Sequence, residues 1–498
     1  MTYKSTRGGM SGVTAAEAIK MGIAPDGGLF VPESKVTVDL DFINELVDCS
    51  YLKRAEKILS LYLDDYAGEE LADCISKAYG DKFSNSEIAP VVAINEHLHM
   101  LELWHGPTCA FKDMALQILP HFLVKAIKKT GEKAEIVILV ATSGDTGKAA
   151  LEGFADVEGT RIVVFYPNGG VSEMQRLQMV TQKGGNTDVI AVNGNFDDTQ
   201  NGVKKIFTDE ALKEKLERKG KKFSSANSIN WGRLVPQIVY YFSAYADLIK
   251  KGGIKAGEKI NFVVPTGNFG NILAAWYAMD MGLPVNRLIC ASNQNNVLTD
   301  FIINGVYNRK RDFYKTISPS MDILISSNLE RLLFELNGKN SDLVSEWMRE
   351  LTKKGEYRVD GRTKERIQKV FWGGYSNDDE TIASIRSVYQ ESGYLMDTHT
   401  AVAMDVYDKY VIYSRDLTPT VIVSTASPFK FNRSVAKALF GDKIKNMSEF
   451  ELLSLLSRET GWDIPAGLKD LNKKEVLHKK VCEKDGMPDA VMEILLND

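Results

Sequence analysis

The sequence has no run of about 18 apolar residues, the length that a membrane-spanning helix needs. Its N-terminus, MTYKSTRGGMSG, also lacks the apolar stretch of a secretory signal peptide. We therefore expect a protein that has no membrane partner and works in the cytoplasm.

Cysteine is scarce: there are five in 498 residues, and no two have CxxC spacing. An odd, scattered set is typical of reduced thiols and excludes a disulfide framework or a cysteine zinc site. His97 and His99 could lie on one face of a strand, but no cluster of carboxylates or thiols near them completes a metal site. We expect no bound metal.

Neither sign of charge dominates, with 61 Lys and Arg against 66 Asp and Glu and a net charge of -5. This balance gives no electrostatic reason to expect a nucleic-acid partner. A small anionic substrate is still compatible with a locally basic pocket. The chain is also too long for one compact core, which predicts two or more domains.

Short apolar runs alternate with segments of helical pattern through the middle of the chain. Continuous apolar strands separated by helices are typical of an α/β fold with mostly parallel sheets covered by helices. Ligands in such folds bind at the carboxyl ends of the strands. The predicted strands are residues 135–141, 161–166, 188–193, 260–265, 287–291 and 420–424.

The pattern also divides the chain into four regions. Residues 1–95 are expected to be mostly helical, with the clearest amphipathic stretch at 42–63 and a short strand after Pro90. Residues 96–304 form the α/β core, 305–395 a charged helical insertion, and 396–498 a return to the core followed by a helical tail.

Lys112 is the first candidate for chemistry, within HGPTCAFKD at 105–113. Partial burial among apolar neighbours lowers the pKa of an amine, as a catalytic lysine requires. By itself this pattern is weak, because most lysines are solvated surface charges.

The segment TSGDTG at 142–147 follows a predicted strand and opens a helix, where free N–H groups and hydroxyls can bind an anion. It is equally compatible with an ordinary turn in which Asp145 or Thr146 caps the helix. A nucleotide P-loop is excluded, because Thr142 stands where the first glycine should be and Ala149 follows Lys148.

Three further segments lie at strand ends or helix starts. PTGNFGN at 265–271 has two glycines that can turn backbone N–H groups toward a phosphate. SSANSINWGR at 224–233 offers Asn227, Ser228 and Arg233 to an oxyanion, or else is a helix cap. STASPFKF at 424–431 ends the last predicted strand.

Together these segments resemble the threonine synthases, in the longer of their sequence forms. APDGGLFVP at 24–32, NFDDTQ at 195–200 and HTAV at 399–402 add to the resemblance, which runs in order from residue 24 to residue 431. The resemblance implies the fold of the tryptophan-synthase-β type of pyridoxal-phosphate (PLP) enzymes. It also implies conversion of O-phosphohomoserine and water to threonine and phosphate, by a monomer or homodimer.

The resemblance also implies roles for individual residues. Lys112 would be catalytic and form a Schiff base with PLP, and Thr425 would bond the ring nitrogen. Asp145 would lie near the 3′-oxygen of the cofactor. The cofactor phosphate would lie on the N–H groups of Gly267, Asn268, Phe269, Gly270 and Asn271. The substrate would contact Ser143 and Thr146, and its phosphate would contact Asn227, Ser228 and Arg233.

Two alternatives stay open. Another PLP enzyme of this fold, such as threonine dehydratase or cysteine synthase, would not need the second phosphate pocket that SANSINWGR suggests. A non-catalytic PLP carrier or regulatory binding protein would not need Lys112 together with a complete set of pocket loops.

The sequence predicts that Lys112→Ala abolishes phosphate release from O-phosphohomoserine while leaving the fold intact. The reason is that the substitution removes the amine to which the cofactor is attached. Visible absorbance of purified mutant and wild type, with circular dichroism as the control for folding, checks this. A mutant that keeps the absorption band of lysine-bound PLP would show that Lys112 is not the attachment site.

Overall fold

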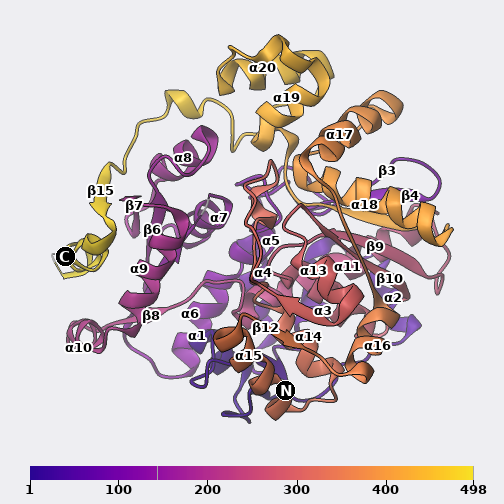
Figure 1. Ribbon diagram of the computed structural model, residues 1–498. Helices are drawn as coiled ribbons and strands as arrows, with labels where there is room; N and C mark the ends of the chain where they lie inside the picture. The colour runs from indigo at the N-terminus through magenta and orange to yellow at the C-terminus, as the bar shows by residue number, and fades with distance from the viewer. Residues whose placement is uncertain (143, 497–498) are drawn as a thin grey trace.

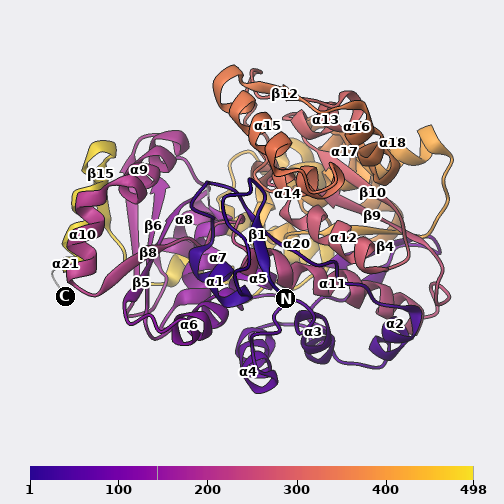
Figure 2. The ribbon, with the colours of Figure 1, turned by 90° about the horizontal axis from the view of Figure 1, so that it is seen from below.

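The computed structural model describes residues 1–142 and 144–496. Its helices and strands form two lobes, each built around a mainly parallel sheet (Figure 1). Figure 2 shows the lobes side by side, with β1 (Tyr3–Ser5) between them. The α/β class predicted from the alternating pattern is confirmed.

One lobe contains a five-stranded sheet whose paired strands are all parallel. Its strands, in spatial order, are β15 (Lys480–Glu483), β7 (Thr187–Asn193), β6 (Thr160–Pro167), β5 (Glu135–Ala141) and β8 (Lys221–Ser224). Helices of this lobe are α6 (Leu119–Lys129), α7 (Asp145–Phe154), α8 (Glu173–Val180), α9 (Phe196–Thr208), α10 (Glu210–Arg218) and α21 (Met487–Leu496).

Strand β5 shows why its sequence is continuously apolar. Ile136 and Ile138 face the main core of the protein, whereas Val137 and Leu139 face a second core under α9 and α21. Because side chains alternate between the faces of a strand, a sheet covered on both faces needs an apolar residue at every position.

The other lobe contains a six-stranded sheet in which only the pair β3–β4 is antiparallel. Its strands, in spatial order, are β13 (Phe371–Tyr375), β10 (Val285–Ser292), β9 (Ile260–Pro265), β14 (Thr420–Ser424), β4 (Leu98–Glu102) and β3 (Val91–Ala93). Helices of this lobe are α5 (Asp113–Leu116), α11 (Trp231–Lys250), α12 (Gly270–Met281), α13 (Val297–Asn304), α17 (Asp378–Ser392), α18 (Thr398–Ser414), α19 (Asn432–Phe440) and α20 (Glu449–Thr460).

The N-terminal region contains the predicted helices and one unforeseen break. The amphipathic stretch at 42–63 is divided into α2 (Leu40–Leu46) and α3 (Tyr51–Leu59), because Ser50 caps a new helix by accepting a hydrogen bond from the Lys53 N–H. The remaining elements are α1 (Ala15–Met21), β2 (Phe30–Pro32), which pairs with β1, and α4 (Gly68–Tyr79).

Residues 305–395 are largely helical but also contain strands. β11 (Val306–Asn308) pairs with β12 (Glu356–Arg358), and β13 is the edge of the six-stranded sheet. The additional helices here are α14 (Leu329–Leu336), α15 (Ser341–Lys354) and α16 (Gly361–Val370), with the short 3-10 helix η1 (Pro319–Met321) before them.

The C-terminal tail returns to the other lobe. After α20 the chain crosses to the five-stranded sheet, where β15 pairs with β7 and α21 packs beside α9 (Figure 1). Strand β15 has no clear sequence signature, because its residues alternate between partly and largely exposed. The tail therefore connects the two lobes.

Among the described residues, no helix combines the length and apolarity needed to cross a membrane.

The packing of the tail predicts that Met487→Ala destabilises the five-stranded lobe by about 2–5 kcal/mol, the usual cost of truncating a buried Met. Met487 is fully buried, and it packs so closely on Gly202 of α9 that a Cβ at that glycine would collide with its sulfur. Val481→Ala, in the same tail but 52% exposed, is the matched control and should change little. Urea midpoints of both variants and wild type measure this; equal midpoints for the two variants would mean that the tail is not packed as described.

Candidate active site

Lys112 lies in a loop that is fixed against the end of β14. Ala110 forms an isolated bridge with Ala426, and the Phe111 N–H donates to the carbonyl of Thr425 over 2.8 Å. The neighbouring Asp113 carboxylate accepts bonds from the N–H and hydroxyl of Thr108, at 2.8 and 2.7 Å. Asp113 therefore shapes the loop that positions Lys112, the last residue before α5.

The Lys112 side chain is only 13% exposed, and its amine lies 3.3 Å from the Ser320 hydroxyl. Burial lowers the pKa of this amine to about 8, although the nearby Asp145 carboxylate acts in the opposite direction. The charges of Lys430 and Arg233 lower it further. Near neutral pH, Lys112 can therefore exchange a proton, which is the property that a catalytic amine requires.

Asp145, the first residue of α7, is paired with two lysines. Its Oδ1 lies 3.1 Å from the Lys430 amine and its Oδ2 lies 3.7 Å from the Lys112 amine. Burial alone would raise the pKa of Asp145, but the two lysines and a bond from Gln175 outweigh it and hold the pKa below its usual range. The carboxyl is therefore ionised.

The capping role considered for Asp145 is wrong. Gly144 is the N-cap residue immediately before α7, with a φ of 136° that favours glycine, and it has no side chain that could cap the helix. The Thr142 hydroxyl instead accepts bonds from the N–H groups of Gly144 and Gly147, both at 2.9 Å. The Asp145 carboxylate is therefore not used in capping and can pair with Lys112 and Lys430.

Ser320 connects residues 305–395 to this ion-pair group. Its hydroxyl donates to Asp145 Oδ2 over 3.0 Å, and its N–H donates to Nε2 of His399 over 3.1 Å. The Nδ1 of His399 faces the Asp397 carboxylate at 2.7 Å. Since His399 accepts from a backbone N–H, its proton lies on Nδ1 and the ring is held by Asp397.

The loop at 265–271 lies beside Ser320. A Cβ added to Gly267 would be 2.7 Å from the Ser320 carbonyl oxygen, so only glycine fits here. Phe269 has a φ of 62°, an uncommon value for a residue other than glycine, and it is the N-cap residue of α12. The loop therefore ends at a helix N-terminus, where backbone N–H groups favour an anion.

Asn271 adds an unused donor to this loop. Its side-chain carbonyl accepts bonds from the hydroxyls of Tyr240 and Tyr241, each at 2.6 Å, which fixes the amide. Its buried Nδ2 has no hydrogen-bond partner among the described residues. Since buried donors are rarely left unpaired, this one fits a phosphate ligand bound at the loop.

Arg233 is a second buried donor on α11. The residue is 5% exposed, its Nη1 donates to the carbonyl of Ala226 over 2.9 Å, and its Nε has no partner in the described part of the chain. Burial lowers the pKa of its guanidinium to about 10, which leaves it charged at neutral pH. An unpaired buried guanidinium is suited to an anion.

The structure brings only some of the predicted residues together. Contacts given above connect Lys112, Asp145, Thr425 and the loop at 267–271, and Arg233 is near enough for its charge to lower the pKa of Lys112. Asn227 and Ser228 bond to each other at a more exposed turn (Ser228 hydroxyl to Asn227 Oδ1, 3.2 Å), while Asn230, not predicted, caps α11. Thr146 is partly exposed beside Asp145. Ser143, the other predicted substrate contact, lies outside the described residues.

Sequence reasoning missed Lys430, Ser320 and Gln175. Lys430 had a signal, because PFKF at 428–431 repeats the phenylalanine–lysine pair of AFKD at 110–113 in an apolar context. Ser320 and Gln175 had none, since each lies in an ordinary polar segment and reaches Asp145 only through the fold.

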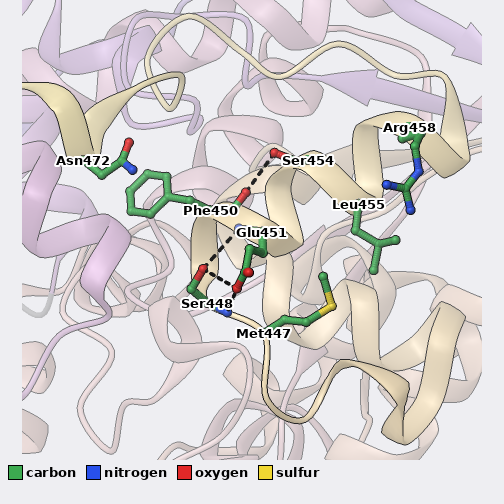
Figure 3. Close-up of a pocket in the computed structure, with 8 residues that line it drawn as sticks. All are labelled: Met447, Ser448, Phe450, Glu451, Ser454, Leu455, Arg458 and Asn472. Atoms are coloured by element: carbon green, nitrogen blue, oxygen red, sulfur yellow. Dashed lines mark hydrogen bonds between the residues drawn. The ribbon is translucent and has the colours of Figure 1, made fainter.

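A hollow of about 590 Å³ lies elsewhere, on α20 (Figure 3). Three of its polar side chains have local partners: Ser448 and Glu451 bond to each other at the start of the helix, and the Ser454 hydroxyl donates to the Phe450 carbonyl. None of its eight lining residues carries a buried polar atom without a partner, so it is a poor candidate for the site of the chemistry.

Three segments match known families. Residues 2–79 match the family described as "Threonine synthase N terminus", 93–364 match "Pyridoxal-phosphate dependent enzyme", and 400–485 match "Threonine synthase, C-terminal". All three matches are in chain order and together cover most of the sequence.

Individual relatives agree with these matches. The human protein "Threonine synthase-like 1" is 40% identical over 482 residues, covering 94% of this chain, which spans only 64% of that relative's length. Threonine synthase of Pseudomonas aeruginosa is 39% identical over 443 residues, covering 89% of this chain and 91% of its own. The crystal structure of PLP-bound threonine synthase from Brucella melitensis superposes with a TM-score of 0.88 at 35% identity, covering 100% of this chain and 99% of the other.

The tight contact at Gly267 predicts that Gly267→Val weakens cofactor binding, seen as faster loss of PLP on dialysis. The added side chain would push the Ser320 segment from the loop and block approach to its N–H groups. Gly361→Val is the matched control, because a Cβ there would meet nothing within 4 Å. If both variants retain PLP as wild type does, the loop at 265–271 does not bind the phosphate.

Proposed function

The chain belongs to the threonine synthase family of pyridoxal-phosphate-dependent enzymes, and from this premise we propose that it converts O-phospho-L-homoserine and water into L-threonine and phosphate. We also propose that the enzyme works in the cytoplasm, as a monomer or homodimer. Its five unpaired cysteines support the cytoplasmic location, because thiols stay reduced there.

The residues present fit PLP as the cofactor. Lys112 would hold it covalently, the N–H groups of residues 267–271 and the unpaired Asn271 amide would hold its phosphate, and the buried Thr425 would bond its ring nitrogen. Bound PLP would supply an electron sink for negative charge developed on the substrate next to its amino group. A hydroxyl at the ring nitrogen would leave that nitrogen largely unprotonated.

Lys112 is suited to move the proton at the substrate Cα. With a pKa of about 8 it is a base strong enough to accept a proton and still loses that proton readily near neutral pH. The Ser320 hydroxyl lies within hydrogen-bonding distance of both Lys112 and Asp145, which keeps the amine facing the site. The carboxylate of Asp145 stabilises the protonated amine after transfer.

Arg233 is suited to bind the phosphate of the substrate. Its unpaired Nε can donate to the leaving phosphate, whose charge grows as the bond to Cγ breaks. Ser228 and Asn227 lie three and four residues before the start of α11, and their side chains would have to turn inward to join Arg233. Thr146 and Ser143 are the proposed contacts for the rest of the substrate.

The observation that carries the proposal is that two separate buried donors, Arg233 Nε and Asn271 Nδ2, have no hydrogen-bond partner among the described residues. One phosphate of a cofactor accounts for one of them. A substrate that brings its own phosphate accounts for the other, and threonine dehydratase or cysteine synthase chemistry does not require it. The lowered pKa of Lys112 argues against a non-catalytic PLP carrier.

The direct test is to incubate the PLP-loaded protein with O-phosphohomoserine and to measure phosphate and threonine together. Equal amounts of the two are expected. Release of phosphate without threonine would mean that the protein is an elimination enzyme and not a synthase. If neither phosphate nor threonine is formed, the proposal is wrong. The dehydratase alternative is tested by incubating the protein with serine or threonine and measuring ammonia; ammonia release would favour that alternative.

The site predicts that Arg233→Ala lowers kcat/KM for O-phosphohomoserine by about 30- to 150-fold, since a charge-assisted bond to phosphate contributes about 2–3 kcal/mol. Part of the loss should be in kcat, because the leaving group gains charge as it departs. PLP should stay bound. Steady-state kinetics with PLP absorbance recorded in parallel check this.

Arg176→Ala is the control, because that arginine is paired with Glu173 at the surface, where its side chain is 36% exposed. An Arg233→Ala protein that loses PLP but handles substrate normally would mean that the two phosphate sites have been interchanged.

A further inference from the structure

We propose that Lys430 is a positioning residue, which holds the Asp145 carboxylate as an anion and keeps the amine of Lys112 free to act as a base. This inference rests on the proposed function only in taking Lys112 as the amine that reacts.

Lys430 is held in one place by its surroundings. Its side chain is 0% exposed, and it lies in the short 3-10 helix η2 (Pro428–Phe431) that follows β14. Its amine donates to the Thr108 carbonyl over 2.8 Å and lies 3.1 Å from Asp145 Oδ1. A buried ammonium is costly unless an anion pairs with it. This lysine is therefore built into the site as a fixed charge and is not available as a second attachment point.

The contacts of Asp145 divide cleanly between its two oxygens. Oδ1 faces Lys430 and the Gln175 amide, at 3.1 Å each. Oδ2 faces the Ser320 hydroxyl and Lys112, at 3.0 and 3.7 Å. Lys430 thus takes one oxygen and leaves the other directed at Lys112, which fixes the orientation of the carboxylate.

The charge of Lys430 also acts on Lys112 directly. The groups that face Lys112 are Asp145 from α7, which favours its protonated form, and Lys430 from η2 and Arg233 from α11, which disfavour it. His399 of α18 contacts the site through Ser320, whose N–H donates to its Nε2. Without Lys430, the Asp145 carboxylate would pair with Lys112 alone, and the repulsion between the two lysines would be lost. Both changes favour the protonated form of Lys112, so its pKa would rise.

The test follows the attachment of PLP to the purified chain as a function of pH, because only unprotonated Lys112 forms the bond. Visible absorbance gives the rate, and borohydride trapping with peptide mapping shows that Lys112 is the residue modified. For wild type, the rate should reach half its maximum near the pKa of about 8. For Lys430→Met, we expect this midpoint to move up by about one pH unit, so that attachment near neutral pH is about tenfold slower.

Lys148→Met is the matched control. Lys148 is also a buried lysine, 9% exposed, but its amine pairs with Glu152 at 2.8 Å and with Gln182. Its replacement removes a buried charge without touching the Asp145 pair, so the midpoint should stay where it is in wild type. A midpoint that is unchanged in Lys430→Met, or moved equally in Lys148→Met, overturns the proposal.

A second comparison covers the case in which Lys430→Met does not fold. The double variant Asp145→Asn/Lys430→Met removes both charges of the pair together, and it is compared with Asp145→Asn alone. The double variant should have the higher midpoint; equal midpoints overturn the proposal. Threonine formation is measured separately, so a protein that shows these midpoints but makes no threonine would refute the proposed function and leave the role of Lys430 intact.

Discussion

The buried carboxylate of Asp145, balanced between two lysines, is the interaction on which the site depends. Asp145 opens α7 in the five-stranded lobe, whereas Lys112 and Lys430 are fixed to the end of β14 in the six-stranded lobe. Two lysines buried this close would repel each other without an anion between them. The carboxylate therefore joins the lobes and sets the charge of the site, and it limits how far burial lowers the pKa of Lys112.

The position of this group follows from the sheets. The loops that carry the site begin where β5, β9 and β14 end, and ligands in parallel sheets bind at this edge because loops there meet helix N-termini. The start of α12 and the guanidinium of Arg233 both belong to this region: the loop before α12 packs against Ser320, and the charge of Arg233 lowers the pKa of Lys112. Ser320, from residues 305–395, completes the group by contacting Lys112, Asp145 and His399.

Much of this could be predicted because some strands are buried on both faces. The predicted bounds of β5, β9 and β14 agree with the structure to the residue, and an uninterrupted apolar run is a local property of the sequence. The division of the strands between two sheets could not be predicted, because an apolar run does not specify the strand with which it pairs. The edge strands β13 and β15 were also missed: the first contains two adjacent glycines and the second is half exposed, so neither has a strong pattern.

The sequence by itself determined the family and the strands that end in the site, and it singled out Lys112 and the glycine-containing loop at 265–271 as the candidates for cofactor attachment and phosphate binding. These depend on residue types at short spacing. Only the tertiary structure decided that Asp145 pairs with lysines and does not cap a helix, that Lys430 is its partner, and that Arg233 is buried with a donor unpaired while Asn227 and Ser228 lie apart from it. Those are matters of distance and burial between segments up to 285 residues apart in the chain (Asp145 to Lys430), and the strength of a charge interaction is set by that distance and burial, which no local pattern encodes.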